Sequence, residues 1–117
     1  MNTVAIRPPA VAGSFYPGIT SELQKELAKC LAVTQASNSS AVSPEPSFTA
    51  ASGEILKALI VPHAGYIYSG GTAGRAYALL APLAARIRRV ILLGPCHRVS
   101  VRGLAVPTVS AFATPLG

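Results

Sequence analysis

The chain has 117 residues, half of them hydrophobic and 12% charged, which allows one domain at most and excludes disorder throughout. Its net charge of +6 does not indicate nucleic-acid binding, because no basic run is interleaved with stacking aromatic residues and no known nucleic-acid-binding motif is present. The four acidic residues are all glutamates, so a Ser-His-Asp triad is excluded and a paired-carboxylate mechanism has no candidates.

Residues 1–18 are expected to be irregular. Their three prolines and two glycines forbid a continuous helix or a central strand, and their apolar side chains indicate packing across the body of the protein. Two of the prolines interrupt the start, no apolar signal region follows, and no run approaches the ~18 residues of a membrane span. We therefore expect a cytoplasmic protein that makes no membrane contact.

A helix is predicted next. Ser21 and Gln24 fit a capping box, and an apolar stripe consists of Leu23, Leu27, Cys30 and Leu31. The helix is expected to end near Val33. Residues 34–53 are rich in Ser, Ala and Pro and nearly uncharged, which indicates a flexible insertion or long loop.

The second half of the chain predicts a strand, a helix and a strand. Residues 56–61 and 89–93 are apolar runs typical of strands that are covered on both faces. Residues 69–83 predict the helix between them, with Ser69 as its N-cap. Its expected inner face consists of Ala73, Ala76, Tyr77, Leu80 and Ala84. Such a unit has parallel strands and a right-handed crossover. A weaker third strand is expected at residues 102–106, and residues 114–117 indicate a turn.

The only two histidines follow the two predicted strands. His63 comes after Pro62, and His97 comes two residues after Pro95. Parallel neighbours lie about 4.8 Å apart and their carboxyl ends share one edge, so both imidazoles are expected to reach a single ion. The alternative is that each histidine is a hydrogen-bonded loop residue. Cys96 adjoins His97 but is expected to point elsewhere, because neighbouring side chains diverge in extended backbone.

Tyrosines and glycines surround the first histidine. Tyr66 and Tyr68 either shape a pocket beside His63 or pack in the core or at its rim. Gly65, Gly70, Gly71 and Gly74 flank the start of the predicted helix. They favour close packing of backbones over an anion cradle, because the chain has neither a Walker lysine nor the GxGxxG spacing there.

The motif at residues 62–70 (PHAGYIYSG) and the motif at residues 93–97 (LGPCH) resemble the Memo family, whose prokaryotic members are called AmmeMemoRadiSam system protein B. Residues 7–17 resemble the opening of that family, and residues 114–117 resemble a segment that follows its second histidine motif. The likeness covers nearly the whole chain outside residues 34–53. Position 96 departs from the family, because it is Cys where Ser is common.

The resemblance implies an α/β fold similar to class III extradiol dioxygenases, with a βαβ-based, mostly parallel sheet and flanking helices. It implies that His63 and His97 belong to a metal site for an iron or copper ion, with Tyr66, Tyr68 and Cys96 in the pocket. The remaining pocket residues of the family lie in later sequence, and the family is at least twice as long. We therefore expect residues 1–117 to be the N-terminal part of a single Memo-like domain, with an incomplete fold and no turnover as a fragment.

Two functions stay open at this point. The first is a metal-binding, dioxygenase-like redox protein, and the second is a non-catalytic scaffold that holds a peptide or partner subunit on the same rim. A phosphate-binding protein that uses residues 70–74 is a third option. The small-molecule or peptide partner is undefined by the sequence. The excess of apolar residues indicates a surface that something else covers, so self-association through an exposed sheet edge is also expected.

Overall fold

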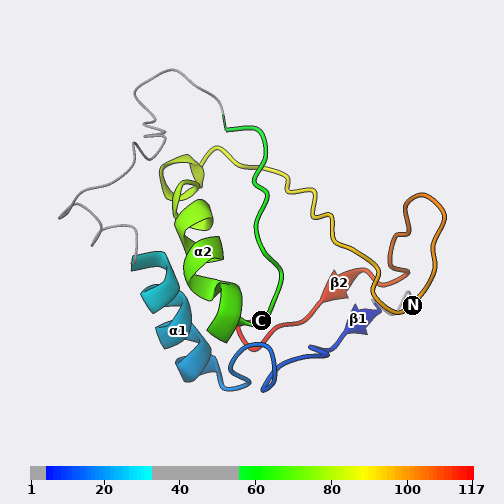
Figure 1. Cartoon of the computed structure of the whole chain (residues 1–117), viewed down its shortest axis with the longest axis horizontal. Coiled ribbons are helices and arrows are strands. Elements are labelled where there is room, and N and C mark those ends of the chain that lie inside the picture. Colours follow the sequence, from blue (N-terminus) through cyan, green and yellow to red (C-terminus); the bar gives the residue numbers. More distant parts are fainter. Residues whose placement is uncertain (1–4, 33–55) are drawn as a thin grey trace.

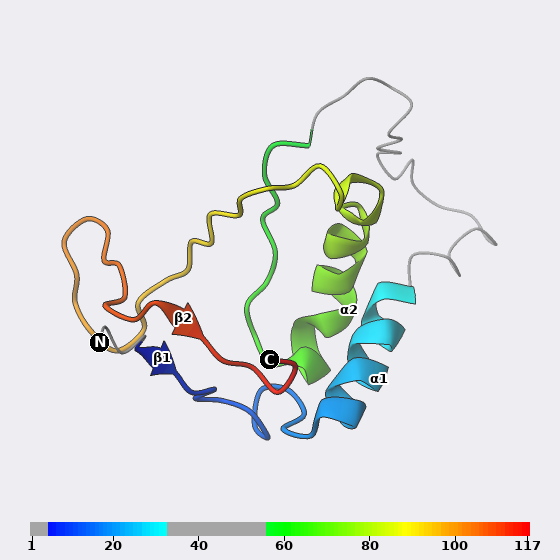
Figure 2. The ribbon, with the colours of Figure 1, turned by 180° about the vertical axis from the view of Figure 1, so that it is seen from behind.

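The computed structural model describes residues 5–32 and 56–117. In chain order it contains strand β1 (Ile6–Arg7), helices α1 (Thr20–Ala32) and α2 (Tyr66–Ala78), the 3-10 helix η3 (Ala81–Leu83) and strand β2 (Ala111–Phe112). The two helices lie side by side at one end and the two strands lie together at the other (Figure 1), and the view from behind shows the same division (Figure 2). The chain is thus a small α/β structure, which agrees with the predicted class.

The predicted βαβ unit is wrong for this structure. Residues 56–61 and 89–93 run without ladder pairing, and so does the expected third strand at residues 102–106. A strand needs the backbone hydrogen bonds of a neighbour, and the described part of the chain offers these segments none. Many of their side chains are exposed: Ile60 is 100% exposed and Leu92 is 84% exposed, while Leu56, Leu59 and Val61 are half-buried.

The sheet instead joins the two ends of the described chain. β1 and β2 are parallel, with Ile6 opposite Ala111 and Arg7 opposite Phe112. The guanidinium of Arg7 lies 5.7 Å from the centre of the Phe112 ring, a cation–π contact that reinforces this short pair. Neither two-residue strand has enough length to show a period-two pattern, so sequence periodicity did not indicate them.

The C-terminal turn and the start of α1 also meet. The Thr20 hydroxyl donates a hydrogen bond to the carbonyl of Pro115 at 2.6 Å. The predicted turn at residues 114–117 is confirmed, because the Thr114 and Gly117 backbone groups exchange hydrogen bonds at 3.1 and 3.0 Å. These contacts secure the last described residues against the base of the helical layer.

Helix α1 forms where the spacing of its apolar residues predicts a helix, although it starts one residue before the expected cap Ser21. Leu23 and Cys30, seven residues apart, are its buried positions, while the expected stripe member Leu31 is 41% exposed. Glu22 in the first turn and Lys29 in the last turn complement the helix dipole. The described helix ends at Ala32; Val33 and the expected insertion at residues 34–53 lie outside the described residues.

Helix α2 starts three residues earlier than predicted and buries a different face. Gly65 is its N-cap, and Ser69, the expected cap, is buried inside the first turns together with Gly70 and Gly74. The expected inner-face residue Tyr77 is 44% exposed. The buried face is the small-residue face because α1 approaches α2 closely there.

The contact between the helices centres on Cys30. A Cβ added at Gly70 would lie 2.9 Å from the Cys30 sulfur, and one added at Gly74 would overlap the Cys30 carbonyl oxygen. Gly70 and Gly74 therefore serve the close packing that their sequence context favours, and Gly65 packs against the backbone of Phe15. Gly71 faces open space, with nothing within 4 Å of an added Cβ.

Stability is expected to fall in alkaline solution. Burial raises the pKa of the Cys30 thiol above its usual 9.0, and Glu26 raises it further. Burial likewise raises the pKa of Tyr66 above 10.0. Because the folded state holds these protons more tightly, their contribution is fully present below the unfolded pKa values and is lost as pH rises toward the folded ones. Urea midpoints measured from about pH 8 to about pH 11 are expected to decrease, with the decrease starting near pH 9.

The variant Cys30→Ala isolates the thiol part of this effect. Its midpoint at neutral pH is lower because the packing contact is lost, but its decline above pH 9 is expected to be shallower than that of the original chain. Equal slopes for the two proteins would contradict a role for Cys30 in the alkaline loss.

No helix in the described residues has the length and apolar character needed to cross a membrane.

Candidate metal centre

His63 lies in the turn that leads into α2, and this turn is held from two sides. The Tyr66 backbone N–H donates to the Phe15 carbonyl at 2.8 Å, and the buried Gly65 leaves room for that carbonyl. The Ser69 hydroxyl donates to the Ala64 carbonyl at 2.9 Å. The N-terminal segment thus contacts the body through the Phe15 carbonyl and holds the backbone just after His63, although the side chains of Ile6 and Phe15 are 58% and 50% exposed rather than packed as expected.

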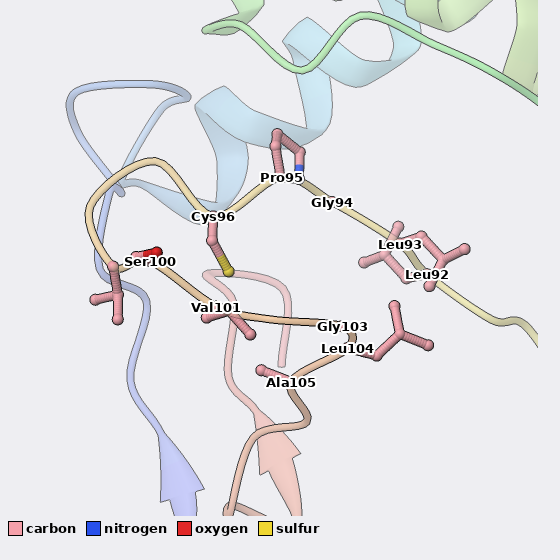
Figure 3. Close-up of a pocket in the computed structure, with 11 residues that line it drawn as sticks. Leu92, Leu93, Gly94, Pro95, Cys96, Ser100, Val101, Gly103, Leu104 and Ala105 are labelled. Atoms are coloured by element: carbon pink, nitrogen blue, oxygen red, sulfur yellow. The ribbon is translucent and has the colours of Figure 1, made fainter.

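His97 lies at the far end of the run that contains residues 89–93. Pro95 restricts the backbone two residues before it, and an irregular loop of residues 98–105 follows. Gly103 in this loop has φ of 78°, a conformation that favours glycine. The loop turns back on residues 92–96 and borders with them an open cavity of about 490 Å³ (Figure 3).

The structure brings the two predicted histidines together. Their Nε2 atoms lie 3.1 Å apart, a hydrogen-bond distance that also fits the alternative of hydrogen-bonded loop histidines, and their ring centres lie 5.2 Å apart with the planes tilted by 33°. Both side chains are exposed. Neither strand pairing nor a shared sheet edge creates this juxtaposition; the turn before α2 and the loop after Pro95 do.

The two histidine nitrogens have a spacing that fits two ligands of one metal ion. Two nitrogens that occupy adjacent positions on one ion at ~2.1 Å lie about 3.0–3.4 Å from each other, and the observed separation of 3.1 Å falls in that interval. The described residues contain no group of three or more His, Cys, Asp and Glu side chains that could hold an ion. The pair therefore offers an ion two protein ligands, which leaves further coordination positions to other donors.

Cys96 is the nearest sulfur in sequence to this pair, but its side chain lines the cavity of residues 92–105 (Figure 3). This direction agrees with the divergence of neighbouring side chains expected from extended backbone. Cys96 is exposed and forms no disulfide. Leu92, Leu93 and Leu104 also line the cavity, whose surface is mixed polar and apolar.

The two tyrosines do not border that cavity. Tyr66 packs in the body, with its ring centre 5.8 Å from that of Tyr16. Burial raises the pKa of its hydroxyl, and the nearby Cys30 and Tyr16 add to the effect. Tyr68 is 85% exposed on α2. Of the two alternatives for these tyrosines, packing in the core or at its rim fits Tyr66. Tyr68 makes no hydrogen bond or ring contact with the histidines.

Sequence patterns did not point to the residues that support His63. Phe15 acts through its backbone carbonyl, which no side-chain pattern reveals. Ser69 was expected to cap α2 by accepting a hydrogen bond from a backbone N–H. In the structure its hydroxyl instead donates a hydrogen bond to the Ala64 carbonyl in the preceding turn. Ser and Thr hydroxyls commonly donate to a carbonyl three or four residues earlier, and the carbonyl of Ala64 lies five residues earlier, so this general tendency did not indicate the bond.

A family model described as Memo-like protein matches residues 7–117. The chain is 35% identical over 115 residues to Protein MEMO1 of Xenopus tropicalis, covering 98% of this chain and 33% of that one. It is 34% identical over 112 residues to a MEMO1 family protein of Nitrosopumilus maritimus, covering 96% and 37%. Over 61 residues, 52% of this chain and 17% of the other, it is 49% identical to the Protein memo-1 homolog of Caenorhabditis elegans.

The chain thus spans about a third of the length of the two relatives that it matches almost completely. No solved structure matches it significantly.

Proposed function

Because this chain belongs to the Memo-like family, we propose that it is a metal-binding protein in which His63 and His97 hold an iron or copper ion. The observation that carries the proposal is the approach of the two Nε2 atoms to 3.1 Å. Imidazole suits both metals, and adjacent ligand positions require a separation of this size.

Other residues of the chain orient the two donor nitrogens. A ligating Nε2 must present its lone pair, so the ring proton of each histidine resides on Nδ1 in the loaded form. The turn held by Phe15 and Ser69 limits the positions that the His63 ring can take. Pro95 restricts the backbone before His97. Both rings are exposed, so solvent and small molecules reach the site directly.

When bound, iron or copper would supply redox chemistry or polarise a bound oxygen donor. The resemblance to dioxygenases extends this chemistry to activation of O2 in a protein with a complete ligand set. With two protein ligands rather than the three usual at catalytic metals, we propose binding without turnover for residues 1–117 alone.

Metal analysis tests the proposal. The purified chain is stripped with a chelator, loaded separately with Cu²⁺ and, without oxygen, with Fe²⁺, and then dialysed. We expect retention of a defined amount of metal and a raised thermal midpoint, since a ligand that binds only the folded state stabilises it. Metal content at the level of a buffer blank would refute metal binding.

A non-catalytic scaffold is the second candidate, and the exposed apolar surface favours it. Leu92 and Leu93 are 84% and 75% exposed and border the cavity of residues 92–105. Surfaces of this kind often receive peptides or partner subunits. Peptide binding that survives chelation would favour the scaffold, whereas binding that chelation removes would favour the metal site.

A further inference from the structure

Residues 11–16 form a tight turn, here called the N-terminal turn. The Gly13 N–H donates a hydrogen bond to the Tyr16 carbonyl at 2.8 Å, and the Phe15 N–H donates one to the Val11 carbonyl at 2.9 Å. Gly13 has φ of 81°, a left-handed conformation that glycine adopts without steric cost. The N-terminal turn is therefore held in shape by its own backbone.

The N-terminal turn contacts the start of α2 in two places. The Phe15 carbonyl accepts a hydrogen bond from the Tyr66 N–H at 2.8 Å, and the ring centres of Tyr16 and Tyr66 lie 5.8 Å apart. A Cβ added at Gly65 would lie 3.3 Å from the Phe15 carbonyl oxygen and 3.5 Å from the Phe15 Cα. The turn, in blue, lies beneath the first residues of α2 in both views (Figure 1 and Figure 2). It thus meets the chain tightly just after His63.

The same segment also holds α2 further along the helix. The chain continues from the N-terminal turn into α1, and Cys30 of α1 packs against Gly70 and Gly74 of α2. Helix α2 is therefore held at its start by the turn and in its middle by α1. Because close-packed elements leave little free volume, the start of α2 cannot shift without disturbing one of these contacts.

We propose that the N-terminal turn is a positioning element of the metal site and that it acts on His63 through the contact between Phe15 and Gly65. Only Ala64 lies between Gly65 and His63, and planar peptide units transmit a displacement over so short a distance. His97 belongs to a separate segment, so the displacement would alter the 3.1 Å between the two Nε2 atoms. Metal–ligand distances vary by only ~0.2 Å. The inference rests on the proposed function, because the pair must bind an ion, and it holds whichever other groups complete the coordination.

Gly65→Ala and Gly65→Val disturb the contact in graded steps. The Gly65 backbone has φ of −58° and ψ of 153°, which alanine and valine also adopt, so the added side chain acts by pressing on Phe15. At a Cβ distance of 3.3 Å the Phe15 backbone has to move by a few tenths of an ångström. Changes in residues that orient a ligand lower metal affinity by ~10–100-fold. We expect a loss of Cu²⁺ affinity in this range for Gly65→Val and a smaller one for Gly65→Ala.

Gly13→Ala disturbs the N-terminal turn from its other side. Nothing lies within 4 Å of a Cβ added at Gly13, so this change acts only through the positive φ, which alanine adopts at a cost. Gly13→Asn is the conservative variant, because asparagine adopts positive φ more readily. We expect Gly13→Ala to lower Cu²⁺ affinity and Gly13→Asn to restore most of it. Gly71→Ala is the matched control, since its added Cβ also meets nothing within 4 Å.

Copper competition and spectroscopy on the same samples separate positioning from loss of fold. Cu²⁺ affinity is measured against a chelator of known affinity, at a temperature where far-UV circular dichroism shows that every variant is folded. The electron paramagnetic resonance spectrum of each Cu²⁺-saturated protein reports its nitrogen ligands. We expect two imidazoles in the original chain and in Gly71→Ala, and a signal altered toward one imidazole in Gly65→Val and Gly13→Ala. A purely structural role of the turn would leave the spectrum of the folded, saturated protein unchanged.

Amide exchange gives a readout without metal. The Tyr66 N–H is held by the Phe15 carbonyl at 2.8 Å, so its exchange with solvent should be faster in Gly65→Val and Gly13→Ala than in the original chain. Gly71→Ala should leave it unchanged. This measurement shows that the variants open the intended contact before their copper binding is compared.

The outcomes separate this inference from the proposed function. Faster Tyr66 exchange together with the original Cu²⁺ affinity and spectrum would overturn the positioning role and leave metal binding intact. The same loss of affinity in Gly71→Ala would also overturn it. Absence of bound metal in the original chain would overturn both proposals. If Gly65→Val does not fold, the milder Gly65→Ala and the two variants at Gly13 give the same decision.

Discussion

Replacing His63 or His97 with alanine is expected to abolish specific uptake of iron or copper. Each histidine supplies half of the protein donors at the site, and removal of either leaves a single imidazole. Even residues that only orient a ligand alter metal affinity by ~10–100-fold when they are changed, so loss of a ligand itself should exceed that range. Metal retained per chain after dialysis, measured by elemental analysis, gives the result directly.

The folded state should survive both substitutions. The two side chains are exposed, and exposed truncations away from caps and networks usually change stability by less than ~0.5 kcal/mol. Far-UV circular dichroism checks the two helices, and Cys96→Ser serves as a control that should keep the original metal content. If the His63→Ala, His97→Ala double variant retained the original stoichiometry, the ion would have to bind elsewhere, and the proposed function would lose its residues.

The variant Gly74→Ala should strongly destabilise the helical layer. The added methyl group would overlap the carbonyl oxygen of Cys30 and press on its Cβ, at 3.0 Å. Backbone atoms cannot rotate aside as a side-chain end can, so α1 and α2 must separate. Overpacking of this kind costs about 1–3 kcal/mol. We expect a loss near the upper value, since Cys30 is one of only two buried hydrophobic residues among those described. Urea unfolding measures it.

Gly71→Ala is the matched control on the same helix. Nothing lies within 4 Å of its added Cβ, so only the intrinsic preference for alanine remains. Alanine in a helix interior stabilises by roughly 0.5–1 kcal/mol over glycine. The two variants are therefore expected to shift the urea midpoint in opposite directions. A stabilising Gly74→Ala would show that the helices do not approach each other as closely as the structure describes.

The helices were predictable because their signals are local. The spacing of Leu23 and Cys30 marks the buried stripe of α1, and glycines at residues 70 and 74 indicated close backbone packing in α2. The strands were not predictable. Residues 56–61 and 89–93 have the apolar composition of buried strands, but a strand also needs a neighbouring strand to pair with, and composition does not show whether one is present. The actual pair, residues 6–7 with 111–112, is set by tertiary contact across the chain rather than by any local pattern.

For the candidate site, the residues were predictable but the reason for their meeting was not. His63 and His97 could be singled out because each follows a proline at the end of an apolar run, and because the sequence has few other residues that bind metals. The expected cause was a shared edge of a parallel sheet. In the structure the Phe15 carbonyl and the Ser69 hydroxyl fix the first turn, and neither contact has a signature strong enough to be recognised before the chain is folded.

The parallel pairing of β1 with β2 has a consequence for the order in which the structure assembles. Ile6 and Ala111 are separated by nearly the whole chain, and closing a flexible loop of that length costs about 4 kcal/mol of chain entropy. Two short strands offset little of this entropy cost unless packing of the helices has already brought the two segments close together. The strand pair is therefore expected to be the last described element to form on folding and the first to open, so its hydrogen-bonded amides should exchange with solvent faster than those of the two helices.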